Sequence, residues 1–92
     1  MQFKFTPQLI KKISKLKRQQ PKTFQKIQKQ LTIFQANSRH PSLRTHKLTG
    51  QLKNSFSISI ERNLRMIYYL TENKQTLIAV FFALGTHDQV YR

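Results

Sequence analysis

Residues 55–85 read SFSISIERNLRMIYYLTENKQTLIAVFFALG, and this stretch decides the fold of the 92-residue chain. At its start, Phe56, Ile58 and Ile60 alternate with serines. This alternation predicts a strand with one buried face, because successive side chains of a strand point to opposite sides. Residues 61–63 (ERN) then predict the tip of a hairpin.

Two further strands are expected after this tip. In residues 64–71 the apolar residues at even positions share one face, which leaves Arg65 on the other. A turn over residues 72–74 leads to residues 77–84, which are apolar throughout, as in a central strand, and Gly85 ends that run. An exposed arginine beside apolar strand neighbours has no evident packing role, so Arg65 is a candidate for function.

A strand and two helices are expected ahead of this sheet. Residues 2–5 alternate apolar and polar side chains. Thr6 and Pro7 predict the start of a helix over residues 7–19, because the hydroxyl caps the first turn and proline lacks an N–H that this turn does not use. After Pro21 a second apolar stripe recurs at three- and four-residue intervals, at Phe24, Ile27, Leu31 and Phe34.

The order strand, helix, helix and three strands predicts an α+β fold. We expect residues 1–92 to form a single domain, in which the N-terminal strand and the helical hairpin pack on one face of a mainly antiparallel four-stranded sheet. Residues 37–54 are polar and basic and predict an ordered loop, or a loop with one short strand. The sheet face away from the helices is left open for function.

Charge gives the first indication of function. The chain has 17 Lys and Arg against 3 Asp and Glu, a formal net charge of +14, and no acidic residue precedes Glu61. Such self-repulsion destabilises a compact monomer and is tolerated where phosphates or an acidic protein neutralise it. A polyanionic partner is therefore expected.

Several other classes of protein are disfavoured. The chain has no cysteine, and its three histidines are too scattered for a zinc-binding spacing, so no metal or other cofactor is expected. No apolar stretch approaches the length of a membrane span, and residues 1–5 lack the layout of a secretion signal. We expect a cytoplasmic protein.

Three segments together resemble the signature stretches of the RelE/YafQ/YoeB toxins: residues 46–50 (HKLTG), 63–68 (NLRMIY) and 84–91 (LGTHDQVY). They follow in that family's order and spacing, and the likeness covers the whole chain. The resemblance implies a RelE-like fold and an mRNA interferase, an endoribonuclease that enters the ribosomal A site and cuts mRNA there. It also implies a partner, the acidic antitoxin of a toxin–antitoxin pair.

The resemblance also implies site residues. Metal-independent RNA cleavage needs a base for the ribose 2′-OH, a cation beside the phosphate and an acid for the leaving 5′-oxygen, and histidine suits either proton role. By position in the family's motifs, Arg65 is the phosphate clamp, His87 the general acid, His46 the leading candidate for the base, and Tyr91 the ring that stacks on or orients a base. RNA and ribosome binding is assigned to exposed cations: Lys11, Lys15, Arg18, Lys22, Lys26, Lys29, Arg44, Lys47 and Lys53.

The identity of the base stays open. Acidic or histidine residues of related toxins fall on Ser42, Ser59 and Asn63 here, and Glu61 is a possible substitute, although a carboxylate at a hairpin tip is more often a solvated turn residue. Two other functions also stay open: a ParE-like toxin that inhibits DNA gyrase without cutting nucleic acid, and a structural ribosome-binding protein, for which the charge alone would suffice.

Overall fold

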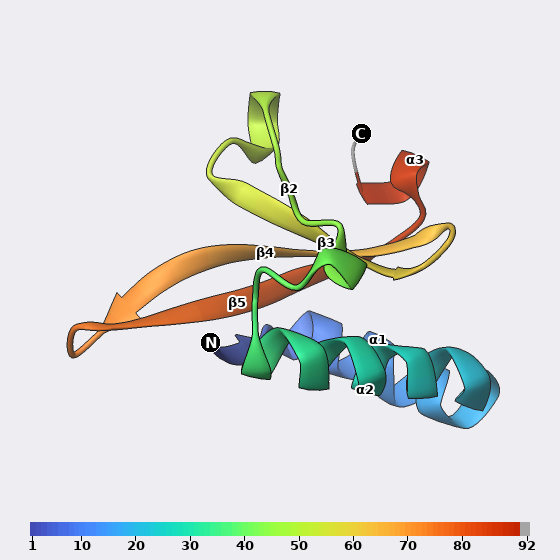
Figure 1. Ribbon diagram of the computed structural model, residues 1–92. Helices are drawn as coiled ribbons and strands as arrows, with labels where there is room; N and C mark the ends of the chain where they lie inside the picture. Colours follow the sequence, from blue (N-terminus) through green and yellow to red (C-terminus); the bar gives the residue numbers. More distant parts are fainter. Residues whose placement is uncertain (91–92) are drawn as a thin grey trace.

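The computed structural model describes residues 1–90, shown in Figure 1. In chain order the helices and strands are β1 (Gln2–Phe5), α1 (Pro7–Gln19), α2 (Pro21–Ala36), β2 (His46–Lys47), β3 (Ser55–Glu61), β4 (Leu64–Asn73), β5 (Thr76–Gly85) and α3 (His87–Val90). Two short 3₁₀ turns, η1 (Pro41–Leu43) and η2 (Gly50–Leu52), flank β2. The predicted order of a strand, two helices and three strands is confirmed.

The sheet has five strands in the order β1-β5-β4-β3-β2, so the expected count of four was one too low. β1 pairs with β5 in parallel, and the other pairs are antiparallel. The extra strand is β2, which pairs His46 with Ser57 and Lys47 with Phe56. Two residues are too few to produce a periodic pattern, and the pairing with β3 makes this segment a strand.

The second hairpin turn lies later than expected. β4 continues to Asn73 and β5 begins at Thr76, so the turn consists of Lys74 and Gln75 rather than residues 72–74. Both turn residues have positive φ, 50° and 68°, as the mirror-image turns of tight hairpins require. The strands were expected to be shorter because the polar residues Glu72 and Asn73 resemble turn residues.

The core lies between the helical hairpin and one face of the sheet, as Figure 1 shows. Thr6 accepts a hydrogen bond from the Leu9 N–H at 3.3 Å, which confirms the predicted cap of α1. Phe34 of α2 is fully buried, and its ring contacts Tyr68 and Phe81 edge-on, with both pairs of centroids 5.2 Å apart. Burial raises the pKa of the Tyr68 hydroxyl above its ordinary value.

The opposite sheet face is only partly open. Ser57 and Ile67 on this face are fully buried, because β2, η2 and α3 stand on it (Figure 1). The expectation of an open face was therefore correct only for the space between these elements. Within residues 1–90, no helix is long and apolar enough to cross a membrane.

Candidate active site

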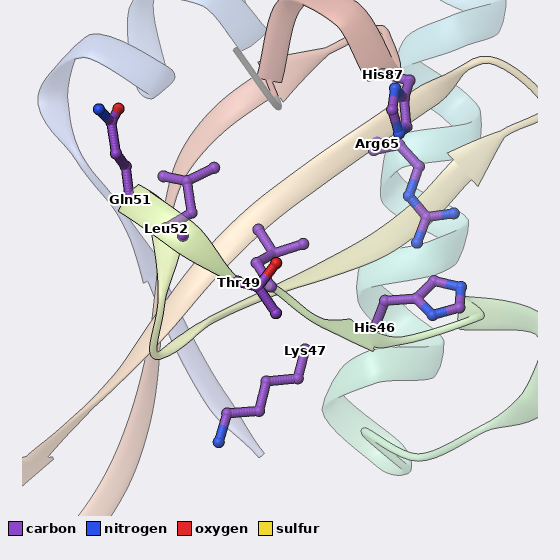
Figure 2. A pocket seen from close by; sticks show the side chains of 9 residues that line it. His46, Lys47, Thr49, Gln51, Leu52, Arg65 and His87 are labelled. Atoms are coloured by element: carbon purple, nitrogen blue, oxygen red, sulfur yellow. The ribbon is translucent and has the colours of Figure 1, made fainter.

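A cleft of about 730 Å³ opens between β2–η2 and α3 on this second face. Arg65 of β4 lies in it, residues 46–52 form one wall, and His87 of α3 contributes from the other side. Figure 2 shows the Arg65 guanidinium between the rings of His46 and His87. Three of the four predicted catalytic residues thus line one cavity, although His46 and His87 are 41 positions apart in the sequence. The fourth, Tyr91, lies outside the described residues.

Arg65 is held in place by three oxygens, of which the Ser57 carbonyl is the most distant, 3.5 Å from Nη2. Its Nε and Nη2 donate to the Ser57 hydroxyl at 3.0 and 2.7 Å, and Nη2 also donates to the Arg44 carbonyl at 2.8 Å. No hydrogen bond within residues 1–90 engages Nη1. A guanidinium anchored along one edge keeps donors for a ligand such as a phosphate, which arginine binds with two parallel hydrogen bonds.

Ser57 was not predicted as a site residue. It is fully buried and lies opposite Ile67 of β4, two positions from Arg65 on the same sheet face. In the sequence it is one of three alternating serines and differs in no visible way from Ser55 and Ser59. Only the register of β3 against β4 puts its hydroxyl beside the guanidinium.

His46 reaches the cleft because β2 adds to the edge of the sheet. It pairs with Ser57, so both side chains are on the cleft side of the sheet. The neighbouring Lys47 alternates to the other side, and in Figure 2 its side chain runs away from His46. The segment is anchored at both ends by buried leucines, Leu43 and Leu48, so the exposed His46 lies on a fixed strand rather than a free loop.

His87 is the first residue of α3 and is exposed. The helix begins with a reciprocal cap: the Thr86 hydroxyl accepts from the Gln89 N–H at 3.4 Å, and the Gln89 side-chain oxygen accepts from the Thr86 N–H at 2.9 Å. This is the capping box of a Thr-x-x-Gln sequence, a signal that was legible in the sequence and was missed. It orients His87 toward the cleft.

Gly85 allows α3 to begin this close to the sheet. It pairs with Arg65, and a Cβ at this position would lie 2.6 Å from the Gln89 Oε1 and 3.0 Å from the Gln89 Cβ. Any side chain here would require the Gln89 side chain, which caps α3, to move. The glycine that ends β5 therefore also places the His87 helix directly beside the strand of Arg65.

The other candidate bases lie elsewhere. Glu61 at the end of β3 forms an ion pair with Lys26 of α2 at 2.9 Å and does not line the cleft. Ser42, Ser59 and Asn63 do not line it either. Among the side chains described in the cleft lining, His46 and His87 carry the imidazoles, and Lys47 is the other residue with a titratable side chain besides Arg65.

The predicted RNA-binding cations are all exposed, on α1, on α2 and on the segment around β2. Lys26 is the one among them with an ion pair in the part of the chain described here. Within the same residues, no group of three or more His, Asp or Glu could hold a metal ion. The site is thus a strongly cationic surface around an Arg–His–His cleft.

Comparisons with known proteins agree with this architecture. Residues 1–92 match the family model described as "Bacterial toxin of type II toxin-antitoxin system, YafQ". None of the curated proteins compared with the sequence matches it.

Solved structures share the fold. The chain is similar to a YoeB/ParE toxin from Agrobacterium tumefaciens, with a TM-score of 0.77 and 14% identity over 95% of this chain and 99% of that one. It is similar to YafQ from E. coli strain BL21(DE3), with a TM-score of 0.73 and 21% identity over 98% and 97% of the two chains. A chain of the E. coli DinJ–YafQ complex gives a TM-score of 0.71 and 22% identity over 98% and 97%.

At these identities the structural likeness establishes the fold, whereas the family match extends over the entire sequence. The three resembling segments contribute residues to one cleft, with Arg65 on β4 between His46 and His87. A chain that carries this fold, this arrangement and a full-length family match belongs to the YafQ family of bacterial toxins of type II toxin–antitoxin systems.

Proposed function

We propose that this toxin is a ribosome-dependent mRNA endonuclease that cleaves by attack of the ribose 2′-OH, without a metal. The observation that carries the proposal is the anchored Arg65 guanidinium between two imidazoles in one cleft. A phosphate bound there has a cation beside its non-bridging oxygens and a proton-transfer group on either side.

The placement of the two histidines suits an in-line displacement. In such a reaction the attacking and leaving oxygens stand on opposite sides of the phosphorus. His46 on one wall takes the proton of the 2′-OH as the new P–O2′ bond forms. His87 on the other side donates a proton to the 5′-oxygen as the P–O5′ bond breaks, and Arg65 stabilises the charge that builds on the phosphate.

Tyr91 is proposed to stack on or orient a base of the mRNA, a common role of aromatic side chains in RNA recognition. The exposed cations of α1 and α2, among them Lys11, Lys15 and Lys22, would grip ribosomal RNA. Action on ribosomes implies a cytoplasmic location.

An acidic antitoxin is the proposed protein partner. The net charge of +14 favours an acidic chain, and the related E. coli toxin is found in a DinJ–YafQ complex. Electrostatic complementarity speeds such association and makes its affinity sensitive to salt. We propose that the antitoxin covers the cleft and the cationic helices, which would explain how a cell tolerates the toxin.

The test is the chemistry of the RNA ends that the toxin makes on translating ribosomes, with the magnesium level fixed. Attack by the 2′-OH must give a 2′,3′-cyclic phosphate or its 3′-phosphate, and a 5′-hydroxyl. His87→Ala and Arg65→Ala should each slow cleavage by roughly two to four orders of magnitude. A similar loss for His46→Ala supports its role as the base.

Several outcomes would contradict the proposal. RNA ends that carry a 5′-phosphate would exclude attack by the 2′-OH. Full activity of the double variant His87→Ala, Arg65→Ala would remove the cleft from the reaction. Inhibition of DNA supercoiling with no RNA cleavage would replace the proposal with a ParE-like gyrase inhibitor.

A further inference from the structure

A second groove lies on the other side of β3 from the cleft. It has a volume of about 570 Å³ and runs between α2 and the β3–β4 turn, with Lys26, Lys29, Arg44 and Arg62 in its lining. A smaller hollow of about 410 Å³ continues it past Arg62 to Thr86. The two share Lys26, Glu61 and Arg62 in their linings, so they lie next to each other around the turn and are treated together as one groove.

The groove is strongly positive. Its acidic residue, Glu61, is already paired with Lys26 at 2.9 Å. Lys29, Arg44 and Arg62 have no ion pair within residues 1–90. Three unpaired cations along one groove concentrate a positive potential there, which favours a polyanion with regularly repeated charges.

Each end of the groove lies beside a residue that builds the catalytic cleft, although no described residue lines both. Arg44 lines the groove, while its backbone carbonyl holds the Arg65 guanidinium at 2.8 Å. Arg44 has the left-handed conformation, with φ 45° and ψ 51°, which is uncommon outside glycine and asparagine. At the other end, Thr86 lines the groove and directly precedes His87. A strand that leaves the cleft at either side therefore meets this groove next.

The groove is built on a fixed floor. Gln30 of α2 is 8% exposed, and its amide donates to the Ser42 carbonyl at 3.2 Å and to the Ser59 carbonyl at 2.8 Å. One side chain thus ties α2 to η1 and to β3, the three elements that form the groove together with the β3–β4 turn. Such preorganisation lowers the entropy lost when a ligand binds.

We propose that this groove binds the ribose–phosphate backbone of the RNA strand that flanks the scissile phosphate. The inference rests on the proposed function, because it extends the substrate path beyond the Arg–His–His cleft. The described lining of the groove contains no aromatic ring, so it offers cations for phosphates but no platform for stacked bases. Binding here should therefore be independent of base sequence and should add affinity without adding codon preference.

The test measures binding of uncleavable RNA to the intact toxin. The probes are fluorescent 2′-O-methyl oligoadenylates of 3 and 12 nucleotides, in which the attacking hydroxyl is blocked. The groove variant is Lys29→Gln with Arg62→Gln, and the charge-matched control is Lys4→Gln with Arg39→Gln, two exposed cations that line neither groove nor cleft. Thermal unfolding checks that both variants keep the wild-type fold.

The 12-nucleotide probe should bind the groove variant about twentyfold more weakly near 0.1 M salt, with a salt slope lower by about 1.4, since each lost phosphate contact on single strands contributes about 0.7. The control should bind this probe much more tightly than the groove variant does. The 3-nucleotide probe, which only fills the cleft, should bind wild type and groove variant alike.

In cleavage assays the groove variant should raise KM and leave kcat near that of the wild type. Equal Kd and equal salt slope for groove and control variants would overturn the inference. It would also be overturned if the groove variant lost affinity only for an acidic antitoxin peptide. A wild-type toxin that binds RNA through the groove but never cuts it would instead contradict the proposed function, so the two failures are distinguishable.

Discussion

Removal of the Ser57 hydroxyl tests the anchored arginine directly. The substitution Ser57→Ala deletes one oxygen that accepts two hydrogen bonds from Arg65, at 3.0 and 2.7 Å, and leaves the Arg44 carbonyl at 2.8 Å and the more distant Ser57 carbonyl at 3.5 Å as anchors. A hydrogen bond to a charged group contributes about 1.5–3 kcal/mol. The two bonds share one acceptor, so we expect a loss at the scale of one such bond rather than of two.

This loss should appear in the rate of cleavage. If the whole amount is lost from the transition state, cleavage slows by about 10- to 150-fold, since each 1.36 kcal/mol is a factor of ten. The assay is single-turnover cleavage of a defined mRNA on stalled ribosomes. The matched control is Ser55→Ala, the same substitution at a buried serine of the same strand, which should cleave nearly as fast as the wild type.

A double-mutant cycle separates a positioning role from a merely structural one. Because Ser57 is proposed to act through Arg65, adding Ser57→Ala to Arg65→Ala should slow cleavage little further. The unfolding free energy of the Ser57 variant should stay within about 1–2 kcal/mol of the wild type. The reasoning is refuted if Ser57→Ala cleaves within twofold of the Ser55 control, or if its effect is undiminished when Arg65 is already absent.

Three further substitutions test the fold and the site assignments. Gly85→Ala would place a Cβ 2.6 Å from the Gln89 Oε1, so this side chain would have to move and give up its hydrogen bond to the Thr86 N–H. Cleavage should fall severalfold, the scale of a lost helix cap of about 1 kcal/mol, while circular dichroism and melting temperature change little, because α3 is a single turn. Unchanged cleavage would mean that α3 need not sit where it does. Phe34→Ala empties a fully buried ring site and should lower the free energy of unfolding in urea by about 3–5 kcal/mol, and a loss below 1 kcal/mol would show that this ring is not central to the core. Glu61→Gln breaks only the partly exposed ion pair with Lys26, so unfolding should change by less than about 1 kcal/mol and cleavage hardly at all; a loss comparable to His46→Ala would make Glu61 the base.

Patterns within single segments were predictable from the sequence. Thr6 and Pro7 define the start of α1 because capping is decided within one turn of chain. The serine–apolar alternation of β3 identifies its buried face, because the period of two is intrinsic to an extended chain. The capping box of Thr86 and Gln89 belongs to the same class, since it is also local, and could have been found in the same way.

Contacts between distant segments were decided by the tertiary structure. The strand character of His46 and Lys47 comes from pairing with β3, and the importance of Ser57 comes from the register of β3 against β4. The ion pair of Glu61 with Lys26 at 2.9 Å exists only because α2 packs beside the end of β3. None of these contacts produces a periodic pattern in the sequence. Each joins two distant segments, and the distance between them in space cannot be read from the number of residues that separate them.

The candidate site combines both kinds of information. The sequence alone determined the α+β class, the helix start, the cationic character and the residue types capable of RNA cleavage, because composition and local periodicity carry them. Only the folded sheet decided that His46, Arg65 and His87 line one cleft and that a buried serine and a backbone carbonyl anchor the arginine. The physical reason is that a site of this kind needs side chains from three strands and a terminal helix, and their distances are set by packing and strand register rather than by sequence spacing.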